Sequence, residues 1–287
     1  INKGIDESDA LVIANRTDQH VETAIKGAAK NKFIFIEKPL SNSLKKLNIL
    51  KEITEKNKKE IETGFMLRFH PNLLELKQII KLNNFGQVHY VRASVGQYLP
   101  DWRPNQDYRQ GYGALKKWGG GVTLDLIHEI DLVLWLFGEV DYLSAQLGYT
   151  PNLEIETESI SQINLKMKSG IPIQLHLDYL RPSYGRFTEI VTEKGTISWD
   201  YLSGKLFFED SKGYKKVIHE VNDNFTRNKM YIDEMKHFIN TIEGNSENLA
   251  SNFYDGECAL RIALSAHLSY KTKKFISPND IKEDYTP

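Results

Sequence analysis

The sequence has few of the features that mark membrane, disulfide-rich or nucleic-acid-binding proteins. Its 287 residues include one cysteine, Cys258, which excludes a disulfide framework within the chain and fits a reducing compartment such as the cytoplasm. No apolar run approaches the roughly 18 residues that a membrane-spanning helix needs. With 37 Lys and Arg against 38 Asp and Glu, the chain lacks the basic excess typical of nucleic-acid surfaces. We therefore expect neither a membrane nor a nucleic acid as partner.

A glycine-rich G-x-G-x-x-G turn is also missing after every predicted strand, and Gly111-Tyr112-Gly113 fails the spacing. Apolar runs nevertheless predict a β-α-β-α-β order, typical of a parallel, helix-covered sheet, with strands at 10–14, 33–36 and 61–65. Three strands make half of a doubly wound nucleotide-binding domain. Either the fold binds no dinucleotide, or the half with the glycine turn precedes Ile1. The chain begins without Met, with residues 1–9 as a surface approach to the first strand, and we expect an upstream segment.

The pattern changes after residue 69. A helix behind Pro71, a strand at 88–95 and a long irregular stretch at 97–118, rich in Tyr, Trp, Arg and Asp, come first. Six strands between 143 and 209 follow one another with few helices, which predicts a mostly antiparallel sheet. Two helices near 229–243 and 255–270 end the chain. The predicted fold class is α/β plus α+β, divided into domains at 1–69 and 70–287, with final helices able to pack back on the first domain.

Three glycines, Gly119–Gly121, open the most informative segment. Asp125, His128 and Asp131 then recur every three residues, so that on a continuous helix they share one 120° arc opposite an apolar stripe. A histidine between two carboxylates suits proton transfer near neutral pH. A polar helix face with a structural histidine is the alternative. A metal site that adds His70 or His176 to these three residues also stays open.

Four ordered motifs resemble the glucose–fructose oxidoreductase and inositol dehydrogenase family (Gfo/Idh/MocA). They are Ile13-Ala14-Asn15-x-Thr17-Asp18-x-His20, Glu37-Lys38-Pro39, Gly64-Phe65-x-x-Arg68-Phe69-His70-Pro71 and the segment from Gly119 to Gly138. The resemblance covers essentially the whole chain. It implies a Rossmann-type domain that binds NAD or NADP, and a C-terminal open sheet that often forms homodimers or homotetramers. Family members usually begin with a strand, the G-x-G-x-x-G turn and two more strands, so we expect roughly 60 residues before Ile1.

The resemblance also implies catalytic roles. Lys38 would donate a hydrogen bond to the reacting oxygen, and His128 would act as the base. The family's usual pair is Asp-x-x-x-His, whereas Asp125 and His128 are one residue closer, so either Asp125 or Asp131 could orient the imidazole. The expected cofactor contacts are Asn15, Thr17, His20, Glu37, Lys38 and Arg68. For Asn15, Thr17 and Asp18 the alternative is a helix cap, and for Arg68 it is pairing with a carboxylate.

The irregular stretch supplies the expected substrate contacts: Trp102, Arg103, Tyr108 and Arg109, with Asp107 beside them. Aromatic faces and arginine forks suit a sugar ring that carries an anionic group, and a packed tyrosine-rich loop is the alternative. Residues 97–104 are similar to a bacterial branch associated with surface-sugar biosynthesis. The sequence therefore predicts a hydride transfer between a nicotinamide and a hydroxyl or keto carbon of a sugar, cyclitol or nucleotide-sugar, with no metal. A redox-assisted glycosidase and a non-catalytic sugar-binding or regulatory protein are the rival functions.

Overall fold

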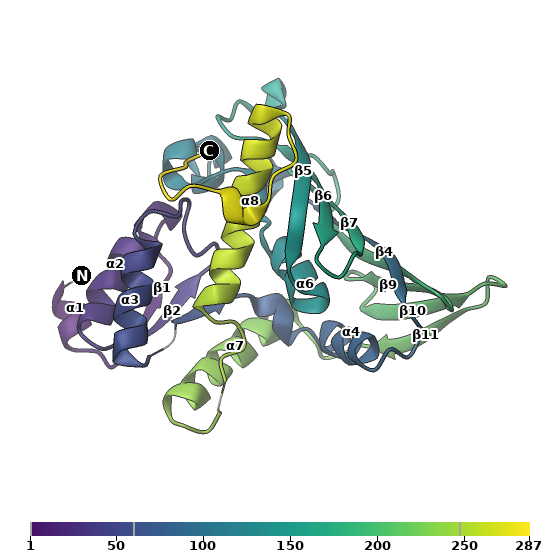
Figure 1. The fold of residues 1–287 in the computed structure, drawn as a ribbon, viewed down its shortest axis with the longest axis horizontal. Coiled ribbons are helices and arrows are strands. Elements are labelled where there is room, and N and C mark those ends of the chain that lie inside the picture. The colour runs from purple at the N-terminus through teal and green to yellow at the C-terminus, as the bar shows by residue number, and fades with distance from the viewer. Residues whose placement is uncertain (1, 60, 247) are drawn as a thin grey trace.

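The computed structural model describes residues 2–59, 61–246 and 248–287, and contains a small parallel sheet beside a large, mostly antiparallel one (Figure 1). The small sheet and its helices comprise α1 (Asn2–Asp6), β1 (Ala10–Ile13), α2 (His20–Ala29), β2 (Phe33–Glu37), α3 (Leu47–Asn57) and β3 (Ile61–Gly64). The strands lie in the order β1-β2-β3, all parallel, which confirms the β-α-β-α-β prediction. One detail differs, because residues 2–6 form a short helix rather than an irregular approach.

The large sheet has eight strands in the order β11-β10-β9-β8-β4-β7-β6-β5. Their bounds are β4 (Val88–Gly96), β5 (Val140–Gly148), β6 (Ile160–Met167), β7 (Pro172–Asp178), β8 (Gly185–Thr192), β9 (Gly195–Asp200), β10 (Lys205–Asp210) and β11 (Lys215–Glu220). Every neighbouring pair is antiparallel except β4 and β7, which are parallel. The predicted fold class is therefore confirmed.

Helices from the later part of the chain join the two sheets. They are α4 (Pro71–Lys81), α5 (Val122–Asp125), α6 (His128–Phe137), α7 (Arg227–Ile242) and α8 (Phe253–Thr272). Figure 1 shows α8, in yellow, running between the small and large sheets, with α7 below it. Phe238 of α7 packs on Phe35 of β2 with 5.6 Å between ring centroids, and the Ser251 hydroxyl donates to the Thr63 carbonyl at the end of β3. The C-terminal helices thus cover the small sheet, and no described helix is long and apolar enough to span a membrane.

The segment after the three glycines is not one continuous helix. A two-residue turn at Leu126 and Ile127 separates α5 from α6, and the Glu129 N–H bonds three residues back to the Leu126 carbonyl. A turn closed over three residues winds more tightly than an α-helix. The prediction of one continuous helical arc through Asp125, His128 and Asp131 is therefore wrong, because the helix on which it depends is interrupted between Asp125 and His128.

A second apolar cluster fixes the irregular stretch at 97–118. Leu99 of that stretch is buried with Val95 of β4, Val122 and Leu126 around α5, and Tyr179 after β7. Burial stabilises the fold by about 1.5–3 kcal/mol for each valine or leucine side chain taken out of water. The stretch is thus held beside the start of α5, where its polar residues can reach the residues that follow β1 and β2.

Candidate active site

Lys38 and His128, ninety positions apart, line one cavity of about 330 Å³, which we call the central cavity. Lys38 follows β2 and His128 begins α6. The cavity's remaining lining residues are Val95, Gln97, Trp102, Arg103, Tyr112, Asp125, Leu126, Tyr184, Arg186, Arg227 and Tyr231. Two neighbouring cavities share part of this wall, and Arg103 and Tyr112 line all three.

The Asp125 carboxylate, in the wall of the central cavity, accepts hydrogen bonds from three side chains. Its Oδ1 accepts from Lys38 Nζ at 3.2 Å and from the Tyr112 hydroxyl at 2.5 Å, while its Oδ2 accepts from the Tyr179 hydroxyl at 2.9 Å. Lys38 Nζ also donates to the Asp125 carbonyl at 2.7 Å. Burial beside this carboxylate raises the pKa of both tyrosines well above 10, so their hydroxyls remain donors. The ammonium of Lys38 is therefore fixed by Asp125 at the edge of the cavity.

The His128 ring is buried against Phe65, with 6.1 Å between ring centroids. Burial, with Lys38, Arg186 and Arg227 nearby, holds its pKa well below 6.5. Its Nδ1 is buried without a hydrogen-bond partner among the described residues, so Nε2 is the nitrogen left to face the cavity. Neither Asp125 nor Asp131 bonds the ring in the part of the chain that the structure describes, which differs from the expectation that one of them orients it.

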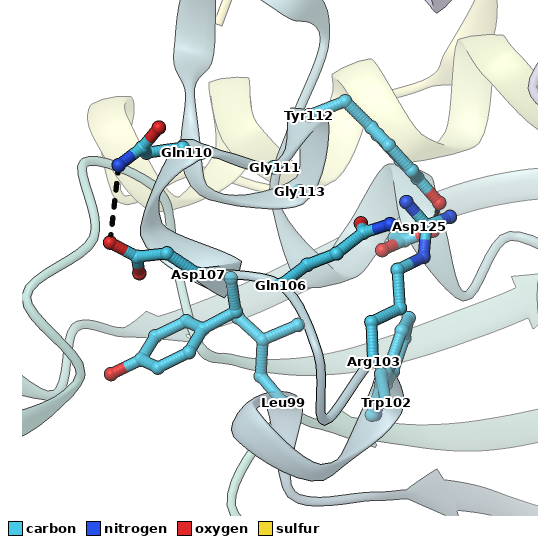
Figure 2. Close-up of a pocket in the computed structure, with 11 residues that line it drawn as sticks. Leu99, Trp102, Arg103, Gln106, Asp107, Gln110, Gly111, Tyr112, Gly113 and Asp125 are labelled. Atoms are coloured by element: carbon cyan, nitrogen blue, oxygen red, sulfur yellow. Dashed lines mark hydrogen bonds between the residues drawn. The ribbon is translucent and has the colours of Figure 1, made fainter.

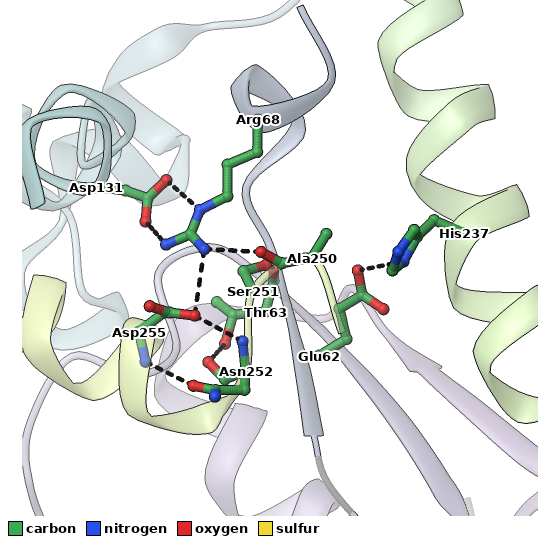
Figure 3. Close-up of polar contacts among 9 residues, drawn as sticks. All are labelled: Glu62, Thr63, Arg68, Asp131, His237, Ala250, Ser251, Asn252 and Asp255. Carbon is green, nitrogen blue, oxygen red and sulfur yellow. Dashed lines mark hydrogen bonds and ion pairs between the residues drawn. The ribbon is translucent and has the colours of Figure 1, made fainter. Parts of the chain in front are cut away.

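Asp131 and Arg68 lie away from the central cavity. Arg68 Nη2 and Nε donate to the two oxygens of Asp131 at 2.6 and 3.1 Å, and Arg68 Nη1 reaches Asp255 at 3.2 Å (Figure 3). Both members of the first pair are buried. Neither Asp131, an expected acid–base residue, nor Arg68, an expected cofactor contact, lines the central cavity, and the structure shows the carboxylate pairing that was the alternative for Arg68.

The expected cofactor contacts from the first motifs surround a second cavity of about 490 Å³ at the carboxyl ends of β1 and β2, which we call the strand-end cavity. It is lined by Ala14, Asn15, Arg16, Thr17, His20, Glu37, Lys38, Arg103 and Tyr112. The carboxyl ends of parallel strands are the usual place for ligands in open α/β sheets. Five of the six expected residues, all except Arg68, therefore line one cavity that meets the central cavity at Lys38.

His20 has a second role within this wall. Its two ring nitrogens lie 2.9 Å from the Asn15 and Pro39 carbonyl oxygens, so the ring bridges the chain after β1 to the chain after β2. Burial lowers its pKa, against the effect of the two carbonyls, and a neutral ring donates to one of them at a time. His20 thus holds the two strand ends together within the wall of the cavity.

The residues expected to contact substrate divide into two groups. Trp102 and Arg103 line the central cavity, and with Tyr108 they also line an adjoining cavity of about 350 Å³ along the irregular stretch (Figure 2). Arg109 instead pairs with Asp107 at 2.9 Å and with Glu154 at 2.6 Å on the exposed side of the loop. Arg109 thus lies outside these cavities, whereas the other three expected residues face them.

Sequence reasoning missed several residues of the central cavity. Tyr112 sits in the aromatic stretch that was singled out, but nothing marked it above its neighbours. Arg186 of β8 and Arg227 of α7 carry no motif, because their position depends on how distant elements pack. Arg186 pairs with the buried Glu129 at 2.6 Å.

No group of three His, Cys, Asp or Glu within the described ranges could hold a metal ion, so the alternative built on His70 or His176 has no geometric support.

Two family models match the chain. Residues 2–65 match the oxidoreductase family with an NAD-binding Rossmann fold, and residues 73–198 match the GFO/IDH/MocA C-terminal domain. The first matched segment ends just after β3, and the second begins within α4.

Curated relatives and solved structures agree with these models. The inositol 2-dehydrogenase/D-chiro-inositol 3-dehydrogenase of Lacticaseibacillus casei is 28% identical over 280 residues, 94% of this chain and 76% of that protein. The myo-inositol 2-dehydrogenase of Thermotoga maritima is 26% identical over 283 residues, 95% of this chain and 80% of that protein. A levoglucosan dehydrogenase solved with NADH and levoglucosan has a TM-score of 0.86 at 16% identity, covering 96% of this chain and 82% of that one. This last likeness shows a shared fold.

Proposed function

The chain belongs to the GFO/IDH/MocA family of oxidoreductases with an NAD-binding Rossmann fold, and from this we propose that it is a dehydrogenase that transfers a hydride between NAD and a hydroxyl carbon of a sugar or cyclitol. One observation carries the proposal: Lys38 and His128 line the same cavity. The similarity to two inositol dehydrogenases supports a polyhydroxylated ring as the substrate class. A nucleotide-sugar and a role in surface-sugar biosynthesis are finer expectations of the same proposal.

The strand-end cavity fits the nicotinamide ribose end of the cofactor. It offers the amide of Asn15, the hydroxyl of Thr17 and the carboxylate of Glu37, beside the ammonium of Lys38. Such groups suit the hydroxyls of a ribose and the carboxamide of a nicotinamide. The cofactor, when bound, supplies the hydride acceptor. We therefore propose that the residues after β1 and β2 hold it, in the domain of residues 1–69, while residues 70–287 supply most of the substrate site.

In the proposed reaction Lys38 and His128 act on one hydroxyl group. Lys38 Nζ, held by Asp125, donates a hydrogen bond to the hydroxyl oxygen and stabilises the negative charge that develops there. The neutral imidazole of His128 accepts the hydroxyl proton at the nitrogen that faces the cavity. Because burial holds its pKa well below 6.5, the ring is unprotonated and ready to accept at neutral pH. Asp125 acts through Lys38 and is a positioning residue.

The test is NADH formation by the full chain with NAD and a panel of neutral and anionic sugars and cyclitols. We expect NADH to accumulate with at least one substrate, and His128→Asn to lower kcat by about 10²–10⁴-fold, the usual contribution of a general base. His89→Asn, an exposed histidine on β4, is the matched control and keeps full turnover. Full turnover by His128→Asn would remove the assigned base. Glycosidic cleavage with no net NADH would instead support the redox-assisted glycosidase.

A further inference from the structure

The central cavity has a strongly cationic wall. Four basic side chains line it, Lys38, Arg103, Arg186 and Arg227, and Asp125 is the one acidic residue among the described residues that line it. Lys38 is bonded to Asp125, and Arg186 is paired with Glu129 behind the wall. Two of the four positive charges therefore have carboxylate partners within the protein.

Arg103 and Arg227 are the other two. Within the described residues, neither guanidinium has a carboxylate within ion-pairing distance: Arg103 lies over the Tyr112 ring at 5.7 Å, and Arg227 Nη2 is 3.4 Å from the Tyr231 hydroxyl. They reach the cavity from separate elements, Arg103 from the irregular stretch and Arg227 from the first residue of α7. Each retains N–H donors that no protein acceptor occupies in the described part of the chain.

The rest of the wall suits a sugar ring. Trp102, Tyr184 and Tyr231 supply aromatic surface around the same cavity, and Gln97 supplies an amide. The volume of about 330 Å³ lies at the small end of ligand pockets, which suits a monosaccharide-sized group. Planar guanidinium groups bind oxyanions through paired hydrogen bonds, so they complement a phosphate or carboxylate attached to such a ring.

We infer that the substrate is a sugar bearing an oxyanion, a phosphate or a carboxylate, and that Arg103 and Arg227 bind this group in the central cavity. The inference rests on the proposed function, since it places the oxyanion beside the hydroxyl that Lys38 and His128 would act on. The positive charge of Arg227 reaches that part of the cavity, because it contributes to the lowered pKa of His128. A bound oxyanion would offset this charge, so binding and proton acceptance would favour each other.

Calorimetric titration of the full chain with glucose, glucose 6-phosphate and glucuronate tests the inference and separates phosphate from carboxylate. We expect at least one anionic sugar to bind about tenfold or more tightly than glucose, as charge-assisted hydrogen bonds predict. Arg103→Gln and Arg227→Gln should each remove about tenfold of that affinity, a larger loss than either causes in glucose binding. Lys236→Gln removes one exposed positive charge further along α7 and is the matched control.

Two results would overturn the inference. One is glucose binding as tightly as both anionic sugars, and the other is an equal loss of affinity in Lys236→Gln, which would indicate a general charge effect. An NADH assay on the same samples separates this failure from that of the proposed function. Oxidation of neutral sugars without any gain from the oxyanion contradicts the inference alone. Arginine-dependent binding of an anionic sugar with no NADH from any tested substrate contradicts the dehydrogenase proposal.

Discussion

His128 has the most distinctive electrostatic environment of the proposed site. Burial is the main cause of its lowered pKa, and the positive charges of Lys38, Arg186 and Arg227 add to it. The low pKa keeps the ring unprotonated well below pH 6.5, so acidification to that value should leave the proposed base active. The pH below which the reaction slows should therefore be lower than it would be if an exposed histidine were the base.

An NMR titration of the His128 ring in the full chain measures this directly. We expect its midpoint well below 6.5, and kcat/KM that stays level as the pH falls toward 6.5. Arg227→Gln removes one nearby positive charge and should move the midpoint upward, whereas Lys236→Gln should leave it in place. A wild-type midpoint near 6.5, or one that ignores Arg227, would contradict the role of burial and of this arginine.

At the scale of elements, the buried ion pair of Arg68 and Asp131 links three parts of the fold. Arg68 follows β3, Asp131 lies in α6, and Arg68 also donates to the Ala250 carbonyl and to Asp255 at the start of α8 (Figure 3). Asp131 is 1% exposed, so it cannot recover its hydration if Arg68 is lost. The pair therefore fixes how α6 and α8 meet the small sheet.

Arg68→Met should lower the free energy of unfolding by about 3–5 kcal/mol, the usual cost of leaving a buried charge unpaired. The double variant Arg68→Met/Asp131→Leu buries neither charge and should recover most of the loss. Urea denaturation of the wild type and both variants measures the difference. A double variant no more stable than Arg68→Met would show that packing or the Asp255 contact, rather than the unpaired carboxylate, dominates.

The elements also show what the sequence could predict. Continuous apolar runs such as Phe33–Ile36 identified the strands of the small sheet, because a strand buried on both faces has few polar residues. The missed strand β11 is lysine-rich and exposed at the edge of the large sheet, so it has no such run. The break between α5 and α6 was missed because a periodicity argument assumes a continuous helix, and the residues of the turn are ordinary Leu and Ile.

The site was predictable where it follows strands or family motifs, and where residue types in the irregular stretch indicated substrate contacts, as for Trp102 and Arg103. Lys38 and His128 were found because each lies in an ordered motif, and the structure brings them to one cavity. Arg186 and Arg227 were not, because their arrival at that cavity depends on the packing of β8 and α7. Residue spacing also could not show that Asp125 bonds Lys38 and two tyrosines, since those partners come from three separate segments.

At the scale of the whole molecule, buried carboxylates lie where α7 meets the small sheet. Glu234 of α7 is 2% exposed and its Oε1 has no hydrogen-bond partner in the described parts of the chain. Burial, with Glu37, Glu62 and Asp131 nearby, raises its pKa from 4.5 to about 9. Burial likewise raises the pKa of Glu62, which faces His237 of α7, to about 8 (Figure 3). At neutral pH the folded protein therefore keeps protons on these two carboxyl groups that the unfolded chain releases.

The sign of the resulting pH dependence follows from this difference. Above pH 4.5 the unfolded chain binds fewer protons at Glu234 than the folded protein does, so stability falls as the pH rises toward 9. Buried histidines act in the opposite direction but lower on the scale: the pKa of His70 is about 3 rather than 6.5, so its cost appears below pH 6.5. Burial lowers the pKa of Lys77 from 10.5 to about 8, so its effect on the pH dependence of stability falls above about pH 8. In the window from about 6.5 to 8 the carboxyl groups are therefore the main contributors to the pH dependence of stability.

The variant Glu234→Gln tests this pH dependence where α7 meets the small sheet. The amide resembles the protonated carboxyl, so the variant should be as stable as the wild type at low pH. From pH 6.5 to 8 its free energy of unfolding should exceed that of the wild type by a growing margin, up to about 1.4 kcal/mol more for each pH unit. Urea denaturation at several pH values in this window measures the two slopes. Glu243→Gln, an exposed change at the end of α7, should keep the wild-type slope. Equal slopes in the wild type and Glu234→Gln would mean that Glu234 is already ionised in the folded protein, and that α7 holds a charged carboxylate against the small sheet.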